Sequence, residues 1–131
     1  MSARLLNPKG WAAPRGYANG VSASGRIILV SGMVGWDASQ RLVPGDLVAQ
    51  ARQALLNIIA VLAEDGARAE HLVRLTWFVT DRAAYLRAAE PLGAAYRDVI
   101  GRHYPAMSVL EVSGLLEPGA VVEIEATAVV P

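Results

Sequence analysis

Strand-like and helix-like segments alternate along this chain, and their order restricts the folds available to it. Segments 26–34 and 72–79 are rich in apolar and β-branched residues, which is typical of strands. Near the C-terminus, residues 105–112 and 121–128 predict two further strands, joined by a short turn as a closing hairpin. A short strand is also predicted at 17–23. With the two helices described next, the predicted order is ββαβαββ.

The first helix is predicted from Leu47 to Ala63. Asp46 is a good N-cap, and Gly66 provides a natural end just beyond the helix. Apolar residues recur between them at helical spacing and predict one buried face. This stripe consists of Leu47, Ala51, Leu55, Ile58 and Leu62.

The second helix is predicted to begin after Asp81 and to end at Gly101. Pro91 lies inside it, so a kink or a restart is expected there. The apolar stripe of this helix consists of Tyr85, Ala88, Ala89, Leu92, Ala95, Tyr96 and Val99.

Two helices can cover only one face of a sheet of this size. Alternation along the strands places further apolar side chains on the second face, and a patch of this kind is unstable in water. We therefore expect that face to be buried against other subunits. The residues assigned to it are Ile28, Val30, Leu72, Phe78 and Val109.

Composition restricts the classes of function. The 131 residues predict one domain, 1–131, with residues 1–16 as a loop or N-terminal arm. Basic and acidic residues balance at 12 each, so nothing favours nucleic acid or an anionic membrane as a partner. The absence of cysteine excludes disulfides and thiolate chemistry. With no signal sequence and no membrane-length apolar run, the expected location is cytoplasmic.

Glu123 and Glu125 are the candidates for acid–base chemistry. They lie two residues apart on the last strand, so both point to the face opposite the helices. A solvated strand face, or a salt bridge to Arg74, is the structural alternative. His71 and His103 have no partners at ligand spacing, so no metal site is expected.

Several segments together resemble the RidA/YjgF family of enamine/imine deaminases. Gly16-Tyr17 resembles the end of a Gly-Pro-Tyr segment, and 28–32 resembles a strand that ends in Ser31-Gly32. Further matches are the helix segment 50–57, the strand 73–81 that ends in Thr-Asp, the Pro-Ala segment before Met107, and the last strand, 122–126.

This resemblance implies an α+β, chorismate-mutase-like fold: a mixed sheet with two helices on one face, assembled as a homotrimer. It also implies small-molecule sites in the clefts between subunits and no cofactor. Members of the deaminase branch hydrolyse 2-imino acids to 2-keto acids and ammonia. Carried across, Glu123 matches the acid that positions water and Tyr17 the residue that closes the pocket. Gly32, with Ser31 beside it, matches a glycine that borders the pocket.

The chain departs from the family at the residue that grips the substrate carboxylate. That position is an arginine in the family and is Met107 here, while a frequent cysteine two residues later is Val109. Without the bidentate guanidinium, a carboxylate loses a strong partner. Arg15, Arg26 and Arg74 are the candidates to replace it.

Two functions follow as hypotheses. The first is a hydrolase that releases ammonia from an enamine or imine whose carboxylate is not at the usual position. The alternative is a non-catalytic trimeric protein that binds or senses a small molecule in the same cleft. An RNA-acting protein is disfavoured by the neutral charge and the lack of a basic stripe.

Overall fold

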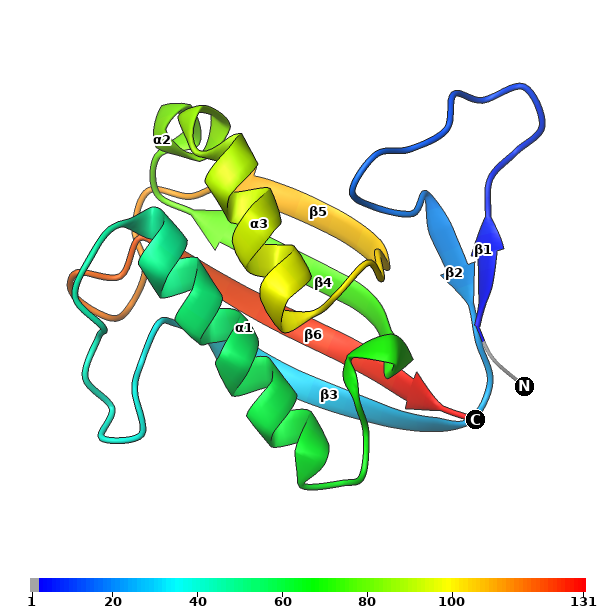
Figure 1. Cartoon of the computed structure of the whole chain (residues 1–131), viewed down its shortest axis with the longest axis horizontal. Coiled ribbons are helices and arrows are strands. Elements are labelled where there is room, and N and C mark those ends of the chain that lie inside the picture. Colours follow the sequence, from blue (N-terminus) through cyan, green and yellow to red (C-terminus); the bar gives the residue numbers. More distant parts are fainter. Residues whose placement is uncertain (1–2) are drawn as a thin grey trace.

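Four strands form a mixed sheet in the order β3-β6-β4-β5, and helices cover one of its faces (Figure 1). The computed structural model describes residues 3–131. β6 pairs antiparallel with both β3 and β4, and β5 pairs parallel with β4. The elements are β1 (Arg4–Leu6), β2 (Gly20–Ser22), β3 (Arg26–Met33), α1 (Leu47–Ala63), a 3-10 turn (Ala69–His71), β4 (Leu72–Val79), α2 (Arg82–Arg87), α3 (Ala89–Val99), β5 (Ala106–Glu111) and β6 (Val122–Val130).

The sheet order corrects the predicted closing hairpin. β5 and β6 are not neighbours, because β4 lies between them. The connection from Val112 to Val121 crosses the end of β4 and brings β6 into the middle of the sheet. A central position suits β6, because alternate side chains from Val122 to Ala128 are buried in the core. The last strand therefore gains a hydrogen-bonded neighbour on each side.

Helix α1 has the predicted bounds because both of its ends carry local signals. The Asp46 carboxylate accepts hydrogen bonds from the backbone N–H groups of Val48 and Ala49, at 3.1 and 3.2 Å. The predicted apolar stripe is buried against the sheet. Just past the helix, Gly66 has φ of +71°, which glycine adopts without steric cost.

The second predicted helix is two helices, α2 and α3. They meet at Ala88, whose φ of −95° and ψ of 12° are not helical. Pro91 follows in the first turn of α3, where its missing N–H removes no intrahelical hydrogen bond. The restart was thus predicted, and it lies three residues before the proline. α1 and α3 lie side by side over the sheet (Figure 1).

The segment 1–16, expected to be a loop or arm, contains the strand β1. This strand pairs antiparallel with β2, and the two form a hairpin beside the main sheet (Figure 1). The predicted strand at 17–23 is therefore shorter than expected and has its own partner. Residues 1 and 2 lie outside the described residues.

Several apolar residues assigned to the second face lie on the helix side instead. Val30 and Leu72 are buried in the core, and Ile28 packs against it. A β-bulge between Leu72 and Arg74 shifts the alternation of β4 and turns Leu72 inward. Val109 pairs with the buried Trp77, so it also faces the helices.

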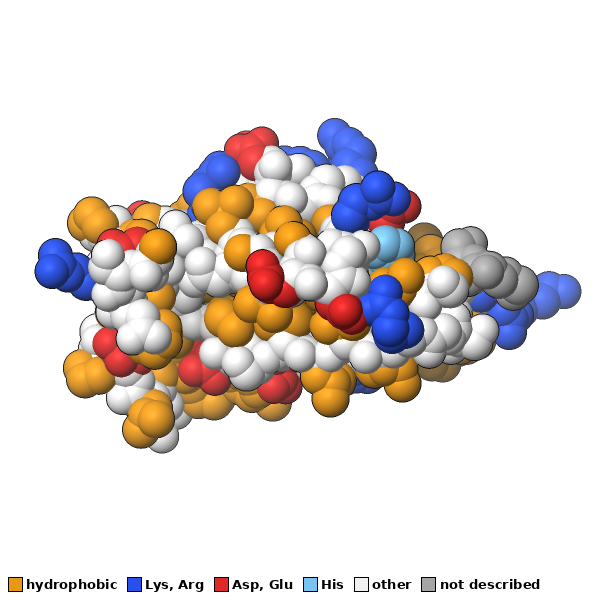
Figure 2. All heavy atoms as spheres, turned by 90° about the horizontal axis from the view of Figure 1, so that it is seen from below, with side chains coloured by type: hydrophobic (Ala, Val, Ile, Leu, Met, Phe, Trp, Pro, Cys, Tyr) orange, Lys and Arg blue, Asp and Glu red, His pale blue; other side chains and the backbone are white. Residues whose placement is uncertain are grey.

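The outer face nevertheless carries apolar side chains. Ile27 and Leu29 are 66% and 76% exposed on β3, Leu110 is exposed on β5, and Phe78 is half-buried. Figure 2 views the molecule from below, edge-on to the sheet of Figure 1, and there too hydrophobic side chains lie between separate acidic and basic groups. The inference that other subunits cover the outer face of the sheet thus rests on Ile27, Leu29 and Leu110 in addition to Phe78, and not on most of the residues predicted. Within residues 3–131, no helix is long and apolar enough to cross a membrane.

Candidate functional site

Glu123 and Gly32 lie against each other on the outer face of the sheet. Glu123 is on β6, opposite Phe78 of β4, and its carboxylate lies over the backbone of Gly32 on β3. A Cβ added to Gly32 would lie 2.7 Å from the carboxyl carbon of Glu123. Only glycine leaves room for the carboxylate in this position.

A β-bulge in β3 brings Ser31 and Gly32 to this place. The pairing of β3 with β6 passes from Val30–Ala126 to Met33–Ile124, so β3 has one extra residue. Ser31 and Gly32 lie inside this irregular stretch, and both are exposed. Bulges of this kind often re-aim residues beside functional sites.

Glu125 has different surroundings from Glu123. It lines a shallow depression of about 470 Å³, together with Ser31, Arg74 and Thr76. Apolar residues, among them Leu29, also line this depression. Among residues 3–131, no ion pair joins Arg74 to either glutamate, so the predicted salt bridge is not formed within one chain.

Met107 lies on the opposite face of the sheet from Glu123. It pairs with Leu75 of β4, whose side chain is in the core, whereas Glu123 pairs with Phe78 on the outer face. Met107 packs against the core and lines a cavity of about 330 Å³ beneath α3. The residues expected to form one site are therefore divided between two faces of the chain.

The cavity at Met107 has aromatic walls that the sequence analysis did not single out. Trp77, Tyr85, Tyr96 and Tyr104 line it. Burial, and secondarily the neighbouring Tyr104, raises the pKa of the Tyr96 hydroxyl, and burial raises the pKa of Tyr85. These two phenols stay protonated at neutral pH, so they can donate hydrogen bonds but not act as bases. Their helical positions had predicted only a core stripe.

Tyr17 lies at the junction between the hairpin and β5. The following residue, Ala18, donates its N–H to the carbonyl of Pro105 at 3.0 Å, which fixes the segment beside the start of β5. The Tyr17 side chain is 42% exposed and lines a separate cavity of about 390 Å³. Gly16 borders both this cavity and the one at Met107.

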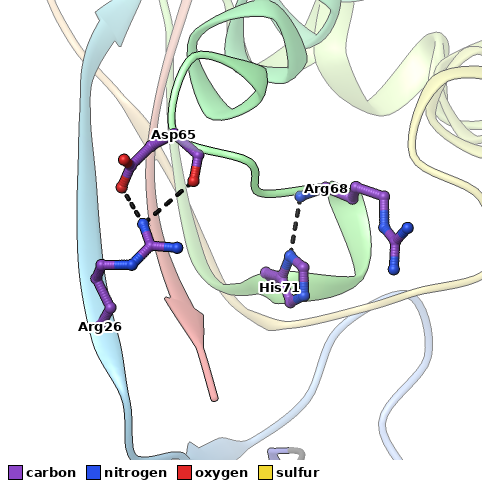
Figure 3. Close-up of polar contacts among 4 residues, drawn as sticks. All are labelled: Arg26, Asp65, Arg68 and His71. Atoms are coloured by element: carbon purple, nitrogen blue, oxygen red, sulfur yellow. Dashed lines mark hydrogen bonds and ion pairs between the residues drawn. The ribbon is translucent and has the colours of Figure 1, made fainter.

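The three arginines proposed to replace the family arginine lie in different places and make different contacts. Arg26 pairs with the carboxylate of Asp65, which ties β3 to the end of α1 (Figure 3). Arg74 is on the outer face, away from Met107. Arg15 alone of the three lines the cavity at Met107, where it is joined by Arg97 of α3.

Both histidines have structural roles. The Nδ1 of His71 accepts a hydrogen bond from the backbone N–H of Arg68 at 2.9 Å (Figure 3), and the Nε2 of His103 lies 2.8 Å from the carbonyl oxygen of Leu72. In the described part of the chain, no cluster of three His, Asp or Glu side chains has the geometry of a metal site.

A larger cavity, of about 630 Å³, lies elsewhere, between the start of α1 and helices α2 and α3. Its two acids, Asp46 and Asp81, already accept hydrogen bonds from the first turns of α1 and α2. We therefore place the candidate site at Glu123 and Met107 and not in this cavity.

Comparison with known proteins identifies the family. The sequence profile of the family described as endoribonuclease L-PSP matches residues 9–130. The chain belongs to this family, which is also called YjgF/RidA. Protein DfrA of Myxococcus xanthus is 38% identical over 111 residues, which are 81% of this chain and 78% of that protein.

Two further relatives match over nearly the full chain. The 2-iminobutanoate/2-iminopropanoate deaminase of Escherichia coli is 33% identical to this chain, and the match covers 98% of each protein. YyfB, a Rid-family protein of Yersinia pestis, is 35% identical in sequence. Its crystal structure superposes with a TM-score of 0.87, and the match covers 99% of this chain and 100% of YyfB. The predicted chorismate-mutase-like fold is confirmed by these structural relatives.

Proposed function

We propose that this protein is a hydrolase that releases ammonia from a reactive enamine or imine. The observation that carries the proposal is the Glu123 carboxylate, which is half-buried and lies over the bulged Gly32 on the outer face of the sheet. Membership of the YjgF/RidA family supports the reaction class, as does the similarity to a deaminase of E. coli.

The chemistry requires one base at the position of Glu123. The carboxylate takes a proton from a water molecule while the water oxygen attacks the imine carbon. The resulting carbinolamine bears a hydroxyl and an amino group on the same carbon. The imine is protonated at the start, so its nitrogen carries two hydrogens in this intermediate. Glu123 returns its proton to the nitrogen and takes the proton of the hydroxyl group as the C–N bond breaks, so that ammonia leaves and the carbonyl product forms. No electrons are gained or lost by the protein.

Met107 indicates that the substrate has no carboxylate at the usual position of the family. A thioether donates no hydrogen bond, and loss of a buried charge-paired partner costs about 2–5 kcal/mol of binding. Met107 and Val109 make this part of the pocket apolar. The preferred substrate is therefore an imine whose polar or charged group lies elsewhere.

A site that uses both Glu123 and Met107 needs more than one copy of the chain. The two side chains lie on opposite faces of the sheet, so one small ligand cannot contact both within one subunit. In a homotrimer, the helix-side cavity of one subunit can meet the outer face of its neighbour. We propose that the ligand binds at such interfaces and that Tyr17 closes the pocket.

The test is ammonia release from freshly generated imines, some with a carboxylate on the imine carbon, as in imines derived from amino acids, and some whose polar or charged group lies elsewhere. We expect the wild-type protein to prefer the second group. Glu123→Gln keeps the size of the side chain but removes the base, and we expect a loss of about 100-fold or more in turnover. Glu125→Gln is the matched control on the same strand face, and we expect it to stay active.

Two outcomes would contradict this proposal. If only Glu125→Gln abolished turnover, Glu125 would be the base. If no imine were hydrolysed, the non-catalytic ligand-binding function would be favoured, because Met107 removes a group that the family uses on its substrates.

A further inference from the structure

The cavity beneath α3 contains two arginines and no acid. Arg15 enters it from the N-terminal segment and Arg97 from α3. No Asp or Glu is among its described lining residues, and within residues 3–131 neither arginine has a carboxylate at ion-pair distance. Asp98, next to Arg97 in sequence, is already held by Arg52 at 2.8 Å. Two exposed arginines without an ion-pair partner in the described chain thus line the same cavity.

Gly93 makes room for Arg97. It lies one turn earlier on α3, and a Cβ added to it would be 3.1 Å from the Nη1 of Arg97. The guanidinium therefore lies across the surface of the helix where a side chain at position 93 would stand. A glycine in the interior of a helix destabilises the helix relative to alanine. The position that Gly93 leaves for Arg97 is therefore gained at a cost in helix stability.

Four aromatic side chains line the cavity and pack against one another in two pairs. Trp77 and Tyr85 meet edge to face, with ring centres 6.4 Å apart and planes at 71°. Tyr96 and Tyr104 are stacked, with ring centres 5.4 Å apart and planes at 12°. The Tyr96 hydroxyl donates to the carbonyl of His103 at 2.6 Å, which holds that pair in place. Fixed rings of this kind suit a planar, apolar ligand.

We infer that this cavity binds an anionic group, such as a carboxylate, carried on an aromatic or similarly planar apolar body. Arg15 and Arg97 are the anion-binding residues, and the aromatic walls hold the ring. The guanidinium fork can accept a carboxylate through two parallel hydrogen bonds. This inference rests on the proposed function, because it names the substrate class of the same site. In this chain the arginines that bind the anionic group are on α3 and the N-terminal segment, whereas the arginine of the family stands at the position of Met107 on β5.

Titration calorimetry with benzoate and its neutral isostere benzamide tests the inference on the full chain. We expect benzoate to bind the wild-type protein more tightly than either benzamide or acetate. Arg97→Gln and Arg15→Gln should each weaken benzoate binding about tenfold, with little effect on benzamide. Arg87→Gln is the matched control, because Arg87 is an exposed arginine on α2 that lines a different cavity.

The inference is overturned if benzoate binds the wild-type protein no better than benzamide, or if Arg87→Gln weakens it as much as the other two variants. Circular dichroism of each variant would show that the fold is kept. Ammonia release is measured on the same samples. Turnover without any preference for benzoate would overturn the anion site and keep the hydrolase. A preference for benzoate without turnover on any imine would overturn the hydrolase and keep the anion site.

Discussion

At the scale of single residues, Gly32 and Glu123 are fitted to each other across two strands. The carboxylate occupies the space that any larger side chain at position 32 would fill. Resemblance to a family was enough to single out both residues, because each lies in a short, distinctive segment. Arg97 could not be found in this way. Its only signal is its place beside the apolar stripe of a helix, which is the usual place of a solvated arginine.

Met107→Arg should restore turnover of 2-imino acids, whose carboxylate is on the imine carbon. The new guanidinium would point into the cavity at Met107 and supply the missing bidentate partner. We expect turnover of 2-iminobutanoate to rise about tenfold or more, as measured by ammonia release. The third positive charge beside Arg15 and Arg97 should lower the melting temperature.

Met107→Leu is the control for this change, because it conserves volume and adds no charge. We expect it to leave both turnover and stability nearly unchanged. Equal gains from the leucine and the arginine variants would show that the effect does not come from charge.

At the scale of elements, the helices were predicted well and the sheet was not, for a physical reason. The bounds of α1 depend on groups within a few residues, namely the Asp46 cap and Gly66. Strand order depends on pairing between distant segments, so the neighbours of β6 could not be identified from its own residues. The bulge after Leu72 moved that one residue to the face opposite the expected one, and the bulge shows only when β4 is paired with β6.

Gly93→Ala should stabilise α3 and weaken anion binding at the same time. Alanine favours a helix interior over glycine by about 0.5–1 kcal/mol, and the neighbouring atom is the end of a flexible arginine that can move. We expect the free energy of unfolding in urea to rise by this amount. Displacement of Arg97 should weaken benzoate binding several-fold in calorimetry.

Ala94→Gly is the opposite change at the next, exposed position of the same helix. It should lower the free energy of unfolding by a similar amount and leave benzoate binding intact. If Gly93→Ala left the affinity for benzoate unchanged, Arg97 would not be held across position 93 in solution.

At the scale of the whole molecule, an open sheet face and a divided site both point to assembly. Ile27 and Leu29 are largely exposed on the same face as Glu123, and the cavity with Met107 lies on the other. Association would bury the first two and bring the parts of the site together.

We expect sedimentation velocity at micromolar concentration to give the mass of a trimer. Leu29→Lys places a charge in the proposed interface, so it should shift the protein toward monomer and remove ammonia release together with assembly. Leu56→Lys, at an exposed position on α1, is the control and should remain trimeric. A monomeric wild-type protein would contradict both the assembly and the shared site.

The central position of β6 also has a consequence for how the chain reaches its native state. β3 and β4 are joined in the sheet only through β6, and the first pair of the β3–β6 ladder joins Arg26 to Val130. Closing so large a loop has a high entropic cost, which slows folding. No part of the main sheet that contains β3 can form until this loop is closed, because β3 pairs only with β6 in that sheet. Refolding should therefore be a single slow step, and the amide protons of β6 should be among the last to exchange with solvent.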